Sequence, residues 1–386
     1  MKIIVAPDSF KGSVTALEAA KSIEKGLRRV LPDAIIDKIP MADGGEGTVQ
    51  SLVDATGGQF RTERVLDPLG NEVEAHYGLL SDGVSSYNCA VIEMASASGL
   101  TLVPTEKRNP LHTTTYGTGQ LIRSALDVGG RKLIIGIGGS ATNDAGAGMA
   151  EALGVRFLKA DGNLIERGGG GLAELASIDI EGIHPAISET DTIVACDVNN
   201  PLTGPDGASY VYGPQKGATP EMVKTLDDNL SHFDDILTQT LGQSYDNIPG
   251  AGAAGGLGAG LMAFLNAKLR LGVDIMIDAV NLRERMKDAS LVITGEGQID
   301  FQTAFGKTPV GVAKVAKEAN IPVIAIAGGI GEGAEAVYAK GIDSMLGIVH
   351  APMSLEDAVE DALPLIADTA EQAARLVMIG KHLHLR

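Results

Sequence analysis

The feature that most constrains this chain is the segment Gly136-Ile137-Gly138-Gly139-Ser140-Ala141-Thr142-Asn143-Asp144-Ala145-Gly146-Ala147-Gly148. It follows an apolar stretch, 132–137, that predicts a buried strand, and it leads into a helical pattern over 143–153. Backbone amides at the start of a helix lack partners and carry partial positive charge, and glycine lets a ligand approach them. The segment therefore predicts a strand, an anion-binding loop and a helix.

Three further junctions have the same character, and all three contain acids. They are Asp8-Ser9-Phe10-Lys11-Gly12-Ser13 after 3–6, Ala42-Asp43-Gly44-Gly45-Glu46-Gly47-Thr48 after 36–40, and Gly295-Glu296-Gly297-Gln298-Ile299-Asp300 after 291–294. One glycine loop is weak evidence. Four of them indicate a site where a phosphate, a divalent cation and a hydroxyl acceptor meet.

Length and charge narrow the class of protein. A chain of 386 residues is too long for one ordinary core and suits two α/β domains with a cleft between them. The net charge of -18 argues against nucleic acid or an anionic membrane as a partner, because both require clustered cations.

Other features predict a cytoplasmic protein. Cys89 and Cys196 lie in apolar, strand-like runs and are expected to be reduced. The N-terminus looks like a first strand rather than a signal peptide. The uncharged segment 248–267 has too many glycines for a membrane span. No heptad pattern fixes the oligomeric state, so a homo-oligomer stays an open alternative.

The first 57 residues alternate between strand and helix patterns. Thr15 and Glu18 form a capping box for a helix that runs to about Val30, and a second helix is expected over 47–55. The period then changes to two, which predicts an antiparallel meander of strands 60–66, 72–80 and 85–93. Its turns are Pro68-Leu69-Gly70-Asn71 and Ser81-Asp82-Gly83.

After 250–260 the alternation of strands and helices returns. Strands are expected at 291–294, 322–327 and 344–348, and helices at 309–319, 333–340 and 355–377. We therefore expect an α/β protein in which residues 1–57 and 265–386 share a parallel sheet and 58–264 form an inserted α/β domain. Two domains in series is the alternative that periodicity leaves open.

Two familiar nucleotide motifs are incomplete here. Gly306-Lys307-Thr308 resembles the end of a P-loop, but Phe301 stands where the first glycine is required, which leaves a phosphate contact or a simple helix cap. Residues 136–141 also fit a relaxed dinucleotide fingerprint. The next suitable acid, Asp161, lies in a turn, so phosphoryl transfer is favoured over hydride transfer.

Six acids follow predicted strands, where α/β sheets place their ligands: Asp8, Asp43, Asp144, Asp197, Glu296 and Asp300. Each alone is explained as a cap or turn residue, but together they predict carboxylates at one sheet edge. Carboxylates can bind magnesium and accept a hydroxyl proton, the two tasks of an ATP-dependent kinase. Lys11 and Lys216, each before a glycine, are candidate anion contacts, and the histidines show no zinc spacing.

These segments, together with 196–202 and 250–258, resemble the type I bacterial glycerate kinases (glycerate 2-kinases) over essentially the whole chain. The resemblance implies ATP-dependent phosphorylation of D-glycerate to 2-phosphoglycerate, with ADP as co-product, in organic acid catabolism. It also implies two domains around a cleft that holds the active site, one of them Rossmann-like and discontinuous.

In this reading Asp197 or Asp8 accepts the hydroxyl proton, and Lys11 assists. The expected glycerate contacts are Ser9, Lys11, Gly12, Ser13, Asp43, Gly44 and Gly45. The expected ATP contacts are Gly138, Gly139, Ser140, Thr142, Asn143, Asp144, Gly146, Gly295, Glu296, Gly297 and Lys307. The expected Mg²⁺ ligands are Asp43, Glu296 and Asp300.

Three alternatives stay open at this point. Phosphorylation at the 3-hydroxyl would give 3-phosphoglycerate, because either hydroxyl fits one cleft. The relaxed dinucleotide fingerprint allows an NAD(P)-dependent hydroxy-acid oxidoreductase. A non-catalytic sensor would bind glycerate without consuming ATP.

Overall fold

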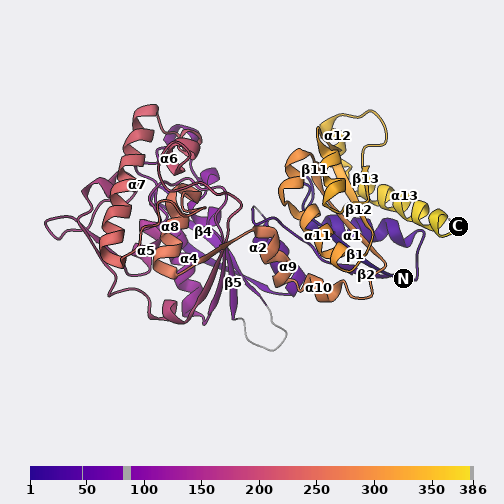
Figure 1. Cartoon of the computed structure of the whole chain (residues 1–386), viewed down its shortest axis with the longest axis horizontal. Coiled ribbons are helices and arrows are strands. Elements are labelled where there is room, and N and C mark those ends of the chain that lie inside the picture. The colour runs from indigo at the N-terminus through magenta and orange to yellow at the C-terminus, as the bar shows by residue number, and fades with distance from the viewer. Residues whose placement is uncertain (46, 81–87, 383–386) are drawn as a thin grey trace. The chain divides into compact units, whose positions relative to one another are not determined.

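The computed structural model describes residues 1–45, 47–80 and 88–382, which form two compact units (Figure 1). Unit 1 contains Met1–Asp43, Gln50–Thr56 and the chain from Val273 onward, and unit 2 contains Gly44–Val49 and Gly57–Gly272. Each unit has its own hydrophobic core. The sequence pattern sets the return to the first domain at 265. The chain returns only at 273, because β10 (Lys268–Arg270) still pairs with a strand of unit 2.

Unit 1 is built on a five-stranded sheet in which all neighbours are parallel. The order is β13 (Ser344–Gly347), β12 (Val323–Ile330), β11 (Leu291–Ile299), β1 (Lys2–Pro7) and β2 (Ile35–Lys38). β1 and β11 are central and nearly fully buried, as expected for apolar strands covered on both faces. The N- and C-terminal parts of the chain therefore share one parallel sheet, as the sequence predicts.

The helices of unit 1 are α1 (Ala16–Arg28), α2 (Thr48–Thr56), α9 (Gly272–Ala279), α10 (Leu282–Arg285), α11 (Thr308–Glu318), α12 (Leu355–Glu360) and α13 (Ala362–His382). The predicted capping box of α1 is confirmed, with Thr15 and Glu18 in reciprocal hydrogen bonds. The single helix expected over 355–377 is wrong. It divides at Asp361, because Pro364 has no amide for the preceding turn and its ring clashes with the carbonyl four residues earlier.

Unit 2 contains a mixed six-stranded sheet. Its order is β10, β9 (Asp191–Ala195), β6 (Lys132–Gly136), β5 (Cys89–Glu93), β4 (Glu72–Leu80) and β3 (Gln59–Leu66). β3, β4 and β5 form the predicted antiparallel meander, and β5, β6, β9 and β10 are parallel. The predicted turn Ser81-Asp82-Gly83 and the strand start at 85–87 lie outside the described residues.

The helices of unit 2 are α3 (Ala95–Ser98), α4 (Tyr116–Asp127), α5 (Ala147–Ala152), α6 (Ala208–Tyr212), α7 (Pro220–Leu241) and α8 (Ala253–Leu265), with a small β7 (Arg156–Leu158) and β8 (Ser177–Asp179) ribbon. The glycine-rich start of α8 packs on the 142–146 loop: a Cβ on Gly255 would lie 2.0 Å from the Thr142 carbonyl oxygen. In the part of the chain that the structure describes, no helix is long and apolar enough to cross a membrane. Cys89 and Cys196 are free thiols.

Candidate active site

The carboxyl edge of the unit 1 sheet contains a topological switch point between β1 and β11. From β1 the chain continues through α1 to β2 on one side, whereas β11 leads through α11 to β12 on the other. Pro7 pairs with Gly295, so Asp8 and Glu296 follow at the same level. Open parallel sheets bind ligands at such a point, outside the carboxyl ends of the strands.

Asp8 is buried, and both of its carboxylate oxygens accept hydrogen bonds. Oδ1 accepts from the Ser9 amide at 2.6 Å, and Oδ2 accepts from Thr308 Oγ1 at 2.6 Å. Burial raises the pKa of Asp8 from 3.8 to about 6, against the effect of the Thr308 hydrogen bond, and the charge of Asp43 adds to the rise. A carboxyl group that titrates in this range is suited to accept a hydroxyl proton near neutral pH.

Glu296 is the second buried acid of this edge. Thr303 Oγ1 donates to Oε1 at 2.7 Å, and Lys307 Nζ lies 4.0 Å from Oε2. Burial raises the pKa of Glu296 from 4.5 to about 7, and the charges of Asp8 and Asp43 act in the same direction. Three carboxyl groups are thus electrostatically coupled at the switch point.

The turn after β1 presents a lysine at the surface. The Phe10 amide donates to the Val14 carbonyl, and Gly12 has a φ of +77°, a left-handed conformation that favours glycine. Ser13 Oγ donates to the carbonyl of Val359 at 3.0 Å. Lys11 is exposed, and its charge lies close enough to Asp8 to act against the raised pKa of that group.

The segment 295–300 is not the loop that the sequence predicts. β11 continues through Gly295, Glu296 and Gly297 to Ile299 and pairs with β12 as far as Ile330. The glycines are needed for close strand packing, since a Cβ on Gly295 would lie 2.0 Å from the Ile326 carbonyl oxygen. Gly295 is therefore a packing position inside the sheet.

The three expected Mg²⁺ ligands, Asp43, Glu296 and Asp300, do not form one cluster in the structure. Among residues 1–45, 47–80 and 88–382, no three His, Cys, Asp or Glu side chains are grouped so that they could hold a metal ion. Asp300 caps the short helix Phe301–Phe305, with its Oδ1 accepting from the Gln302 amide at 2.9 Å. Asp43 and Glu296 remain electrostatically coupled without it.

Gly306-Lys307-Thr308 leads into α11, but neither side chain caps this helix. The Thr308 hydroxyl bonds to Asp8, and the Lys307 ammonium lies near Glu296. The sequence left a phosphate contact and a helix cap as equal interpretations. The observed contacts give these two residues a role in setting the charge of the two acids.

Other predicted site residues lie in unit 2, where the loops after β5, β6 and β9 share one edge of the sheet. The expectation that all six acids share one sheet edge is therefore wrong, because Asp144 and Asp197 belong to this second sheet. Gly138 and Gly139 are exposed after β6. A Cβ on Gly44 would lie 3.7 Å from Asp197 Oδ2, and one on Gly138 would lie 3.9 Å from Gly45 Cα. Asp197 is exposed and accepts from the Gly272 amide at 3.0 Å.

Asp144 is fully buried and serves the loop itself. Its carboxylate accepts from the backbone amides of Thr115, Gly146 and Gly148 at 2.8, 3.1 and 3.3 Å. Burial raises the pKa of Asp144, and these hydrogen bonds oppose the rise. The anion site predicted at this helix start is thus filled by the chain's own carboxylate, and α5 begins only at Ala147 because Ala145 and Gly146 have positive φ.

Lys216 supports the same loop from inside. It is buried, and its Nζ donates to Ser140 Oγ and to the Thr142 carbonyl, each at 2.7 Å. Burial lowers the pKa of Lys216 to about 7, against the effect of Asp144. Asn143 is also buried, with its Oδ1 accepting from Ser209 Oγ. The side chains of this loop therefore shape it, and its exposed backbone is at Gly138 and Gly139.

Sequence reasoning missed the threonines that hold the two acids, Thr303 and Thr308 in their observed pairings, and the apolar residues that follow β13. Spacing could not reveal the pairings, since Thr308 and Asp8 are far apart in the chain. Val349 and Met353, apolar residues just after a predicted strand end, could have indicated a ligand site, and the structure shows that both are exposed.

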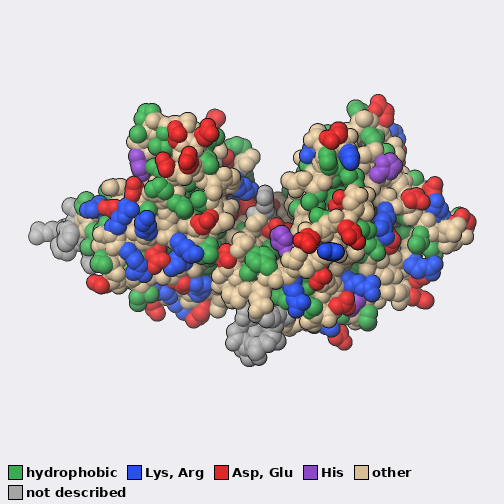
Figure 2. Space-filling view, turned by 180° about the vertical axis from the view of Figure 1, so that it is seen from behind, with side chains coloured by type: hydrophobic (Ala, Val, Ile, Leu, Met, Phe, Trp, Pro, Cys, Tyr) green, Lys and Arg blue, Asp and Glu red, His purple; other side chains and the backbone are tan. Residues whose placement is uncertain are grey.

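On the face shown in Figure 2, Lys and Arg side chains are scattered among acidic and uncharged ones.

Comparisons with known proteins identify relatives that are named as glycerate kinases. Residues 3–378 match the model of the Glycerate kinase family. A glycerate kinase from Halalkalibacterium halodurans is 58% identical over 377 residues, which are 98% of this chain and 97% of that protein. The glycerate 2-kinase of Escherichia coli K12 is 49% identical over 380 residues, 98% of this chain and 99% of that protein.

A crystal structure from Salmonella typhimurium LT2, named as a glycerate kinase 2, has a TM-score of 0.92 and 50% sequence identity. The match covers 99% of this chain and 100% of that one. Because the family model spans almost the whole sequence and the named relatives align end to end, this chain is a kinase that belongs to the glycerate kinase family.

Proposed function

We propose that this protein transfers the terminal phosphoryl group of ATP to the 2-hydroxyl of D-glycerate, giving 2-phosphoglycerate and ADP in organic acid catabolism. The observation that carries the proposal is the pair Asp8 and Glu296 at the switch point of a parallel sheet, with pKa values raised to about 6 and about 7. The 2-hydroxyl is chosen because a relative that is 49% identical is named glycerate 2-kinase.

Asp8 is the proposed proton acceptor, in preference to Asp197. Its pKa of about 6 leaves it ionised but basic at neutral pH, and the Ser9 amide and the Thr308 hydroxyl hold its orientation. Asp197, exposed and bonded to the Gly272 amide, is proposed to contact substrate instead. Transfer to a hydroxyl depends mainly on positioning and charge neutralisation, so a fixed carboxylate suits it.

Asp43 and Glu296 would hold Mg²⁺. Their mutual repulsion shows an excess of negative charge that a divalent cation would relieve, and Mg²⁺ commonly uses one or two carboxylates together with substrate phosphates. When bound, the ion would neutralise charge on the phosphates. Lys307, 4.0 Å from Glu296, places a further cation at this edge.

In unit 2 we propose substrate contacts by the exposed backbone of Gly138 and Gly139, by Gly44 and Gly45, and by Asp197. The remaining residues predicted in the loop, Ser140, Thr142, Asn143, Asp144 and Gly146, would act by fixing its shape. We propose the cytoplasm as the compartment, since ATP is the donor.

A coupled assay of ADP release tests the function, with D-glycerate, L-glycerate, lactate and glycolate as acceptors. We expect ADP release with D-glycerate and its loss in Asp8→Asn. Asp33→Asn, an exposed acid of the same unit, controls for the change of charge. An absorbance change with NAD(P) and glycerate in place of ADP release would favour the oxidoreductase, and glycerate binding without ADP release would favour a sensor.

A further inference from the structure

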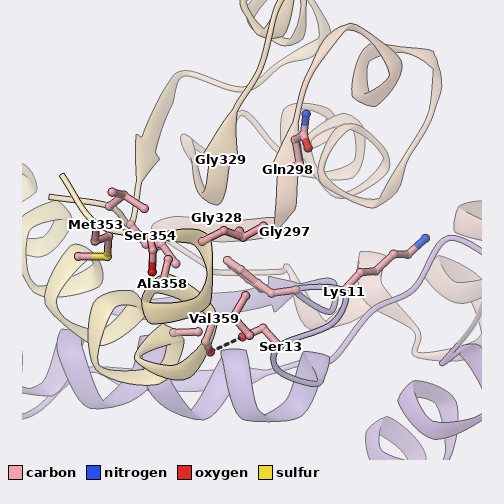
Figure 3. A pocket seen from close by; sticks show the side chains of 15 residues that line it. Lys11, Ser13, Gly297, Gln298, Gly328, Gly329, Met353, Ser354, Ala358 and Val359 are labelled. Atoms are coloured by element: carbon pink, nitrogen blue, oxygen red, sulfur yellow. Dashed lines mark hydrogen bonds between the residues drawn. The ribbon is translucent and has the colours of Figure 1, made fainter. Parts of the chain in front are cut away.

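A pocket of about 390 Å³ lies at the carboxyl edge of the unit 1 sheet (Figure 3). Gly297 of β11 and Gly328 and Gly329 of β12 contribute backbone to it, and the segment between β13 and α13 contributes side chains. Its size is within the range of sites that bind nucleotides and similar ligands, about 300 to 1,000 Å³. It adjoins the switch point, because Gly297 directly follows Glu296.

One side of this pocket is apolar and exposed. Val349, Met353 and Leu355 line it with exposed fractions of 45%, 38% and 81%. Side chains of this kind lose contact with water when a ligand with apolar faces binds, so a cluster of them around a concavity indicates such a ligand.

The two glycines of β12 in the pocket, Gly328 and Gly329, have different roles. A Cβ on Gly328 would lie 2.4 Å from the Gly297 carbonyl oxygen, so this position requires glycine for packing. A Cβ on Gly329, in contrast, would meet no atom within 4 Å, and this residue has no positive φ. Space beside Gly329 is therefore available to a flat group.

Lys11 places a positive charge at one end of the pocket. Figure 3 shows its side chain extending away from Met353 and Val359, so the ammonium lies at the end remote from the apolar wall. The charge of Lys11 also acts on Asp8. The pocket thus runs from an apolar end near α12 to a cationic end near the acids of the switch point.

We propose that this pocket holds the nucleoside of ATP, with the base against Val349, Met353 and Leu355 and the phosphates directed toward Lys11. The assignment rests on the proposed function, in which ATP is the donor. A planar base joined to a polyanion matches an apolar wall that ends at a cation. Glycerate, a three-carbon acid with two hydroxyls, offers this wall almost no apolar surface.

The assignment replaces the expectation from sequence that Lys11 and Ser13 contact glycerate. Ser13 Oγ already donates to the Val359 carbonyl. Lys11 becomes a phosphate contact. Glycerate would then be contacted by the residues of unit 2 proposed above to contact substrate.

A fluorescence experiment tests the nucleoside directly. The chain has no tryptophan, so Leu355→Trp introduces a single reporter in the wall of the pocket. We expect ADP and adenosine to change its emission, and tripolyphosphate and D-glycerate to leave it unchanged. Phe60→Trp, at an exposed position of β3 in unit 2, is the matched control, and its emission should not respond.

Blocking the pocket gives a second test. Gly329→Phe should weaken ADP binding in equilibrium dialysis and raise the KM for ATP by at least about tenfold, because the ring occupies the space of the base. The KM for glycerate should stay within about twofold. Gly380→Phe, at an exposed helical glycine with nothing within 4 Å, controls for the added ring, and circular dichroism checks that both variants fold.

The outcomes separate this inference from the proposed function. Unchanged ADP affinity in a folded Gly329→Phe, or a silent Leu355→Trp reporter when dialysis shows ADP binding, would overturn the inference. A rise in the KM for glycerate alone would assign the pocket to the acid. Loss of the proposed function would instead appear as ADP binding without release of ADP from ATP in the presence of any hydroxy acid.

Discussion

Replacing Asp8 by asparagine should stabilise the protein and inactivate it. The folded state holds this carboxyl with a pKa of about 6, against 3.8 in an exposed chain, chiefly because it is buried. Ionising the Asp8 carboxyl therefore costs more free energy in the folded state than in the unfolded chain. Asparagine has the same shape, and its amide can keep partners at the Ser9 amide and the Thr308 hydroxyl.

The magnitude follows from the two pKa values. Because the pKa is raised on folding, the stabilisation from this group is complete below 3.8 and is lost as the pH rises through about 6. The wild type is therefore expected to be less stable than Asp8→Asn by about 1.5 kcal/mol at pH 5 and by about 3 kcal/mol at pH 8.

Urea-induced unfolding, followed by circular dichroism at pH 5 and pH 8, measures both differences. The pH 5 samples are kept dilute, because pH 5 is close to the isoelectric point of about 4.8 and low net charge favours precipitation. Asp33→Asn, measured in parallel, controls for the removal of one charge from unit 1. The same samples give kcat, which should fall by about 10²- to 10⁴-fold in Asp8→Asn if the proton acceptor is lost.

Two results would refute this reasoning. Equal or lower stability of Asp8→Asn at pH 8 would show that the buried carboxyl carries no penalty. A near-normal kcat would remove Asp8 as the proton acceptor and return that role to Asp197.

Three further measurements test the two buried acids and the packing of unit 1. In the wild type, kcat/KM should fall as the pH drops below about 6, because protonated Asp8 cannot accept a proton, and a flat pH–rate profile would contradict this. Thr303→Val should raise the pKa of Glu296 above about 7 and cost about 1 to 3 kcal/mol, measurable by carboxyl titration in NMR and by urea unfolding; an unchanged pKa would show that the hydrogen bond is unimportant. Gly26→Ala should destabilise unit 1 by about 1 to 3 kcal/mol, because its Cβ would lie 2.0 Å from the Ala367 carbonyl oxygen between α1 and α13, and an unchanged melting temperature would mean that the helices separate freely.

The sequence predicted the sheets well because buried parallel strands are nearly continuous apolar runs. β6 and β11 begin where the pattern places them, and β1 begins one residue earlier. The pattern failed at glycine, because glycine occurs both in loops and where two strands pack closely. At Gly295 it marks close strand packing rather than a loop, and only the position of β12 distinguishes the two cases.

The candidate site was predictable in part. Acids that follow apolar strands were expected at sheet edges, and Asp8 and Glu296 lie at one. Position along the chain does not tell which way a side chain points, so Asp144 was grouped with ligand-binding acids although it accepts from the backbone amides of Thr115 and of Gly146 in its own loop. The pairing of Thr308 with Asp8 is purely tertiary.

The central claim is tested most directly by the phosphorus NMR spectrum of the product formed from ATP and D-glycerate. We predict a new phosphate monoester resonance that couples to a single carbon-bound proton, as required for phosphate on the 2-hydroxyl, together with ADP. A resonance that couples to the two protons of a methylene group would place the phosphate on the 3-hydroxyl. No new monoester, with ATP unchanged, would contradict phosphorylation of glycerate by this protein.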